Sequence, residues 1–121
     1  MAPFAAAECT GQQGPIMKGS VTVVAECTSW AGVAYSIVLG DFQPNVKFHY
    51  RVFVRYNGRL VYSGDTPSFY TSRNGSHFAF KSNQHGMSID CGSGAYLVEA
   101  YAVSDDGKYL TGYDSDTATC G

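Results

Sequence analysis

Four cysteines, arranged as two pairs about turn sequences, constrain the fold of this chain most strongly. The first pair is Cys9 and Cys27, centred on Lys18 beside Gly19, and the second is Cys91 and Cys120, centred on Asp105-Asp106. Residues that face each other across an antiparallel hairpin have Cα atoms about 4.5 to 5.5 Å apart, and a disulfide can bridge that distance. We therefore predict two hairpin disulfides, one within each pair.

A zinc site is the alternative use of these cysteines, because four cysteines allow three disulfide connectivities and can also bind a metal. The chain contains no Cys-x-x-Cys motif, and neither His77 nor His85 has a cysteine at the spacing of a zinc-ligand pair. Disulfides persist in oxidising compartments. We expect a secreted or otherwise extracytoplasmic protein with no metal and no cofactor.

The composition indicates a single all-β domain. A chain of 121 residues has the ordinary size of one domain. Its 14 glycines, 9 tyrosines and 7 phenylalanines suit twisted strands and tight turns, whereas helix-forming residues are scarce. With 15% charged residues and a net charge of -2, the chain lacks the positive field that attracts nucleic acid or anionic lipid. We expect no nucleic-acid partner and no membrane insertion.

The domain is predicted to span residues 9–121, preceded by a flexible N-terminal segment at residues 1–8. The first seven residues include the small side chains of a signal-peptide cleavage site, but they lack a charged n-region and an apolar h-region of adequate length. We interpret the segment as the remnant of a removed signal peptide. An ordinary frayed terminus is the alternative.

Alternation of apolar and polar residues predicts strands along the whole domain. They are 20–28, 33–39, 46–56, 59–63, 69–71, 77–81, 87–90, 95–104 and 108–117. Asn57-Gly58 suits a two-residue hairpin turn between two of these strands. That turn predicts the cross-strand pairs Arg55 with Leu60, Val54 with Val61 and Phe53 with Tyr62.

The strand at 46–56 has two distinct faces. The apolar set, which we expect to point inward, is Phe48, Tyr50, Val52, Val54 and Tyr56. The more basic set, which we expect to face solvent, is Lys47, His49, Arg51, Phe53 and Arg55.

Two segments resemble strands of an immunoglobulin-like domain. The segment from Lys18 to Cys27 resembles the second strand, and the segment from Ser93 to Ala100 resembles the sixth, with Tyr96 at the tyrosine-corner position. The resemblance implies a two-sheet antiparallel sandwich. Val98 stands where antibody-type domains have their second bridging cysteine, so the resemblance implies no intersheet bridge from Cys27. It carries over no function, and a barrel or jelly roll is the alternative fold.

The sequence contains no catalytic signature. No Gly-x-Ser-x-Gly motif occurs, and His49, His77 and His85 are not tied by sequence to a nucleophile. Asp105-Asp106 and the pair Asp114 and Asp116 offer oxygen ligands for calcium, although Asp is also favoured in turns for local hydrogen bonding. We therefore expect a protein that is not an enzyme.

The predicted solvent-facing sheet surface mixes arginine with aromatic side chains, a combination enriched at protein interfaces. Its expected binding residues are His49, Arg51, Phe53, Arg55, Tyr62, Glu99 and Tyr101, with Leu60 and Leu97 beside them. We predict a noncatalytic protein-interaction module of adhesin-like, surface-assembly or inhibitory type, with a protein partner. A loop covering this face is the simpler interpretation of the same pattern.

A carbohydrate-binding module with a glycan partner is the alternative function, because exposed aromatic rings can stack on sugars. The candidate platforms are Trp30, Tyr35, Phe69 and Tyr70. A carrier of an apolar ligand and a metal-dependent enzyme are further alternatives, for which the sequence offers no specific residues.

Overall fold

The computed structural model describes residues 14–28, 32–82 and 92–121. Within these ranges the ordered elements are all strands, and no helix is present that could span a membrane. The strands are β1 (Ile16–Met17), β2 (Ser20–Cys27), β3 (Val33–Gly40), β4 (Lys47–Tyr56), β5 (Arg59–Asp65), β6 (Phe69–Tyr70), β7 (His77–Ser82), β8 (Gly94–Ser104), β9 (Tyr109–Leu110) and β10 (Asp114–Cys120). The predicted strand at 87–90 and the segment at 1–8 lie outside the described residues, as do Cys9, Trp30, His85 and Cys91.

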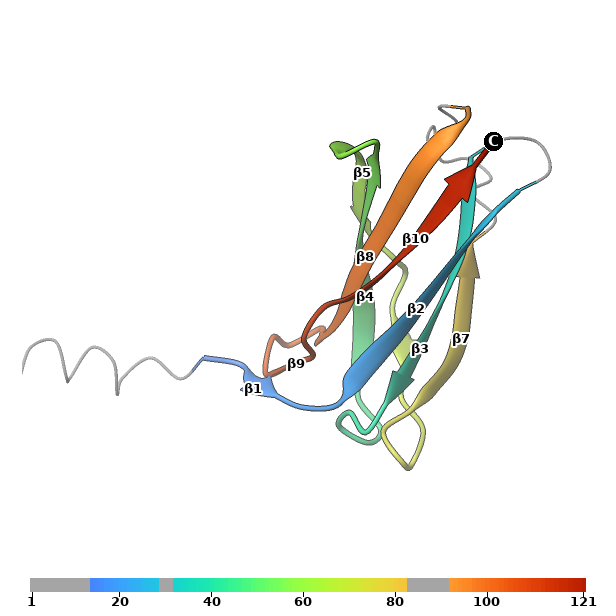
Figure 1. Cartoon of the computed structure of the whole chain (residues 1–121). Coiled ribbons are helices and arrows are strands. Elements are labelled where there is room, and N and C mark those ends of the chain that lie inside the picture. Colours follow the sequence, from blue (N-terminus) through green and yellow to red (C-terminus); the bar gives the residue numbers. More distant parts are fainter. Residues whose placement is uncertain (1–13, 29–31, 83–91) are drawn as a thin grey trace, which may run out of the picture.

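The strands form two sheets that face each other (Figure 1). The small sheet has the order β2-β3-β7, and the large sheet contains the run β10-β8-β4-β5 with β1, β9 and β6 at its margins. Neighbouring strands are antiparallel except β1 and β9, which pair in parallel. The predicted all-β, two-sheet architecture is confirmed.

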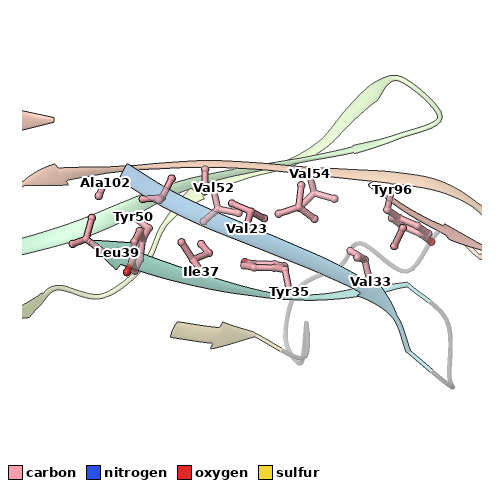
Figure 2. Close-up of a cluster of buried hydrophobic side chains, with 14 of the residues drawn as sticks. Val23, Val33, Tyr35, Ile37, Leu39, Tyr50, Val52, Val54, Tyr96 and Ala102 are labelled. Carbon is pink, nitrogen blue, oxygen red and sulfur yellow. The ribbon is translucent and has the colours of Figure 1, made fainter. Parts of the chain in front are cut away.

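The core lies between the two sheets and is built from alternate residues of each long strand (Figure 2). In β4, Phe48, Tyr50, Val52 and Val54 are each at most 1% exposed, so the predicted inward face is confirmed. They meet β3 residues such as Ile37 across the sandwich. Burial of one such side chain contributes about 1.5 to 3 kcal/mol, so this alternation holds the sheets together.

The hairpin between β4 and β5 matches the prediction only near its turn. Asn57 and Gly58 both have positive φ, and Arg55 pairs with Leu60 as expected. The register then shifts at a bulge, so that Val54 pairs with Tyr62 and Phe53 pairs with Ser63. A bulge adds one residue to one strand, and the side-chain alternation of β5 is therefore reversed beyond it.

The predicted disulfide pairing is wrong, because Cys27 is bonded to Cys120 with Cα atoms 5.5 Å apart. The first expected hairpin does not form, and the second forms with a shifted register, in which Val103 pairs with Leu110 and Cys120 with Gly94. Ile16 and Met17 form β1 in the large sheet, whereas β2 pairs with β3. At the other hairpin, the short strand β9 and the residues after it lengthen the connection, so Cys120 lies opposite Gly94 and not opposite Cys91. The bond instead joins the ends of β2 and β10, across the two sheets.

Candidate interaction face

The outer face of the large sheet gathers most of the predicted binding residues. His49, Arg51, Phe53 and Arg55 alternate with the buried residues of β4 and point away from the core. The antiparallel register places Tyr101 opposite Arg51, Glu99 opposite Phe53 and Leu97 opposite Arg55. These neighbours on β8 are partly exposed, so the two strands present one continuous surface.

Tyr62 does not belong to this face. After the bulge it pairs with Val54, a core residue, and it packs against the core while remaining partly exposed. The phenol ring of Tyr62 lies over Gly64, where a side chain would collide with it. Ser63 and Asp65 point outward instead, opposite Phe53 and Arg51. In the predicted register, which has no bulge, Tyr62 stands opposite Phe53.

The charged residues of the face are paired with one another. Arg55 Nε donates a hydrogen bond to Glu99 Oε1 over 3.0 Å. Arg51 Nε lies 3.1 Å from Asp65 Oδ1, although the angle does not make a hydrogen bond, and the guanidinium of Arg51 lies 5.6 Å from the centre of the Phe53 ring. Exposed pairs of this kind contribute about 0 to 1 kcal/mol. They chiefly neutralise the charge of the face, and the contact with Asp65 holds Arg51 beside Phe53.

Three aromatic residues, Phe53, Tyr101 and Tyr113, form what we call the aromatic patch. Tyr113 lies between the other two, with ring centres 6.3 Å from Phe53 and 5.2 Å from Tyr101, and it is 66% exposed. Tyr113 is not predicted from the sequence, because a continuous hairpin centred on Asp105-Asp106 would place it opposite the buried Val98. The observed register puts it beside Tyr101 instead. Gly107 and Gly112 are the signals of such a shift in the sequence.

An apolar depression, the Met17 depression, adjoins the aromatic patch. It has a volume of about 320 Å³ and is lined by Met17, Tyr101, Leu110, Thr111, Gly112 and Tyr113. Its rim is held in place by β1, where Ile16 N donates to Lys108 O and Lys18 N donates to Leu110 O, both over 2.8 Å. Ile16 and Met17 remain 58% and 61% exposed, so β1 extends the apolar surface of the face.

A second hollow at the other side of Arg51 is polar, and we call it the polar depression. It has a volume of about 310 Å³ and is lined by His49, Asp65, Thr66, Ser68 and Asp105. Asp105 is hydrogen-bonded through one oxygen to His49 Nδ1 and through the other to Ser68 Oγ, both at 2.7 Å. These bonds, that of His49 foremost, hold the pKa of Asp105 below its usual range.

The polar depression does not form a catalytic triad, although it contains Ser68, His49 and Asp105. In a triad the imidazole lies between the hydroxyl and the carboxylate and takes the proton of the hydroxyl. Here the carboxylate lies between the other two groups. Ser68 therefore has no imidazole base, and this arrangement can bind polar groups but does not activate a nucleophile.

The residues predicted for sugar stacking are scattered. Tyr35 is only 4% exposed, and burial raises its pKa to about 12, so it is a core residue. Phe69 packs against the core and stacks on His77 with ring centres 4.6 Å apart. Tyr70 is 68% exposed and lies on the outer face of the large sheet, with Lys47 Nζ 6.0 Å from its ring centre. Trp30 lies outside the described residues.

The acidic residues considered as calcium ligands have other partners. Asp114 Oδ2 accepts the N–H of Val23 over 2.7 Å, and Asp116 Oδ2 accepts the N–H of Ala25 over 2.8 Å. Asp106 accepts hydrogen bonds inside its own turn, which lower its pKa. In the described part of the chain, no group of three or more His, Cys, Asp or Glu residues is arranged to hold a metal ion.

Comparison with known proteins finds a likeness of fold only. No family model and no curated protein matches the chain. Among solved structures, Bacteroides uniformis beta-glucuronidase 2 covalently bound to cyclophellitol-6-carboxylate aziridine is similar, with a TM-score of 0.56 and 11% sequence identity. The match covers 84% of this chain but only 13% of the glucuronidase chain. This likeness supports a sandwich-like all-β fold.

Proposed function

We propose that this protein is a secreted, noncatalytic module that binds a protein partner through the outer face of its large sheet. The observation that carries the proposal is the contiguous apolar surface formed by the aromatic patch and the Met17 depression. Aromatic residues, methionine and arginine are the types enriched in protein interfaces. The Cys27–Cys120 disulfide supports an oxidising, extracytoplasmic setting.

The charges around the aromatic patch define the chemistry of the partner. Arg51 and Arg55 are already matched by Asp65 and Glu99, so the face offers no unbalanced charge to steer a strongly charged ligand. The Met17 depression can accept an apolar side chain such as leucine or phenylalanine. We therefore infer a protein partner that presents an exposed apolar side chain within a neutral surface.

The ring geometry supports a protein partner at the aromatic patch over a glycan. Tyr101 and Tyr113 meet edge to face, with an angle of 79° between their planes. A sugar ring stacks on a flat aromatic face, and two rings at this angle do not form a common platform. Apolar side chains of a protein can pack against both rings.

We also propose that the sandwich is immunoglobulin-like. The small sheet β2-β3-β7 facing the run β10-β8-β4-β5 matches a sandwich whose seven strands divide three and four between the sheets. The Tyr96 hydroxyl donates a hydrogen bond over 2.7 Å to Gly92 O, four residues upstream, as a tyrosine corner does. In this assignment β2 is the first strand of the sandwich and not the second, which differs from the resemblance seen in the sequence.

The proposal is tested by capturing partners from the extracellular fraction of the source organism and measuring the affinity of each captured protein for variants. We expect Tyr113→Ala to weaken binding by about 10- to 100-fold, as truncation of a central aromatic residue does. Tyr70→Ala is the matched control, since Tyr70 is equally exposed but lies outside the aromatic patch. Equal affinity of the wild-type protein and Tyr113→Ala for every captured protein would show that this face is not the interface.

A further inference from the structure

An exposed tyrosine stands beside the polar depression. In the pairing of β6 with β4, Tyr70 lies opposite Lys47, and Phe69 lies opposite the buried Phe48. Tyr70 therefore points outward, on the same face as His49, which is two residues further along β4. Two residues of a strand span about 7 Å, so Tyr70 stands within the reach of a side chain from His49, outside the lining of the polar depression but on the same face.

The groups lining the polar depression can hydrogen-bond a polar ligand without breaking their present bonds. Each carboxylate oxygen of Asp105 accepts one hydrogen bond, from His49 or from Ser68, and retains a further lone pair. The Asp65 carboxylate is about half exposed and lies with Oδ1 3.1 Å from Arg51 Nε. The Thr66 hydroxyl is already engaged, since it donates to Pro67 O and accepts from Tyr50 N. Recognition would therefore depend mainly on the two carboxylates and the His49 ring.

The chemistry of the lining selects among small polar ligands. Arg51 lies against Asp65, and Lys47 lies over the Tyr70 ring, but neither cation belongs to the lining of the polar depression. A negatively charged group of a ligand seated there would face the Asp65 and Asp105 carboxylates directly, which disfavours an anionic ligand. A metal ion is disfavoured as well, because the described residues contain no cluster of three or more ligating side chains with suitable geometry. Sugar hydroxyls can donate to carboxylates and exchange hydrogen bonds with imidazole, while the apolar face of a pyranose ring can stack on tyrosine.

We propose that the polar depression binds one pyranose ring of a neutral sugar, with Tyr70 as the stacking platform and Asp65, Asp105 and His49 as hydrogen-bonding partners. Its volume of about 310 Å³ lies at the small end of the range for small-molecule sites, about 300 to 1,000 Å³. The site is separate from the aromatic patch and lies on the same sheet face.

The test is an NMR titration of the oxidised, ¹⁵N-labelled protein with the methyl glycosides of glucose, galactose and mannose and with their disaccharides. Sodium glucuronate serves as the anionic comparison. We expect at least one neutral sugar to shift the amide signals of Ser68, Tyr70 and Asp105. Tyr70→Ala should weaken that sugar about three- to tenfold, in keeping with the energy of one aromatic contact. Glucuronate should bind more weakly than the corresponding neutral glycoside.

The matched control is Tyr113→Ala, which removes an equally exposed tyrosine from the aromatic patch and should leave sugar affinity unchanged. The two tyrosine variants thus separate this proposal from the protein-binding one, since each variant should affect one ligand class. The sugar site is refuted if no neutral sugar shifts these amides, or if Tyr70→Ala binds sugar as tightly as wild type. It is likewise refuted if calcium chloride shifts these amides and the sugars do not.

Discussion

His77 shows how one partly buried side chain links the pH to the stability of the core. Its ring stacks on Phe69, and its Nδ1 lies 3.1 Å from the hydroxyl oxygen of Tyr50. Burial lowers the pKa of His77 and raises the pKa of Tyr50, so the fold favours the neutral form of both groups. A neutral imidazole can accept the Tyr50 hydroxyl hydrogen through Nδ1, whereas a protonated ring has no acceptor to offer.

Acid should therefore weaken the fold through His77. Because the folded pKa of His77 lies below its unfolded value of about 6.5, the unfolded chain binds the proton more readily. The stability that His77 contributes is fully present above the unfolded pKa. It is lost as the pH falls from there through the lower pKa of the folded protein. Between pH 7.5 and pH 5, we expect the urea midpoint of the wild-type protein to fall more than that of His77→Gln. Glutamine keeps a hydrogen-bond acceptor but does not titrate. Parallel curves for the two proteins over this range would contradict the assignment.

At the scale of elements, β10 supplies side chains to the open edge of β2. The residues of β10 that face inward are Asp114, Asp116, Ala118 and Cys120, and they alternate with serine and threonine on the outside. The two carboxylates accept backbone N–H groups of β2, Ala118 is buried in the core, and the cysteine forms the disulfide. Unpaired backbone N–H and C=O groups at the edge of a sheet can pair with a strand of another chain. Here carboxylates bind N–H groups of that edge in place of a neighbouring strand.

Removing one of these carboxylates should loosen β2 locally. Asp116→Ala leaves the partly buried N–H of Ala25 without its acceptor, which should lower the free energy of unfolding by about 1 to 3 kcal/mol. Amide exchange at Ala25 should also accelerate. Asp116→Asn keeps an oxygen acceptor and should lose less, while Ser115→Ala, on the outer side of β10, is the control. If Asp116→Ala and Ser115→Ala have the same stability, the carboxylate does not hold this edge.

The elements whose prediction failed share a physical cause. Alternation identified the faces of β4 correctly, because burial of one face is encoded in every second residue. Alternation does not encode a bulge. The predicted pairing of β4 with β5 is therefore correct for Arg55 and Leu60 but wrong for Tyr62. In the same way, the break between β9 and β10 shifted the final strand and moved Tyr113 onto the outer face. The predicted and the observed binding faces therefore differ most where an extra residue shifts the strand register.

At the scale of the whole molecule, one covalent bond joins the first and last long strands. Cys27 and Cys120 are 93 residues apart in sequence, so nearly the entire sandwich lies within the loop that they close. A cross-link stabilises mainly by restricting the unfolded chain, and the effect grows with loop length. The two predicted bonds lie in local hairpins and would close much shorter loops. The observed bond therefore restricts the unfolded chain more than either predicted bond would alone.

Replacing both cysteines, as Cys27→Ala with Cys120→Ala, should lower the free energy of unfolding by about 2 to 5 kcal/mol in chemical denaturation. If the loss arises in the unfolded chain, amide exchange that proceeds by global unfolding should accelerate equally in β4 and β8. Faster exchange confined to β2 would instead show that the bond clamps the end of one strand in the folded state. The double variant Cys9→Ala with Cys91→Ala, made in parallel, keeps the Cys27–Cys120 bond. A loss of stability in that control alone would mean that Cys27–Cys120 is not the principal covalent constraint on the sandwich.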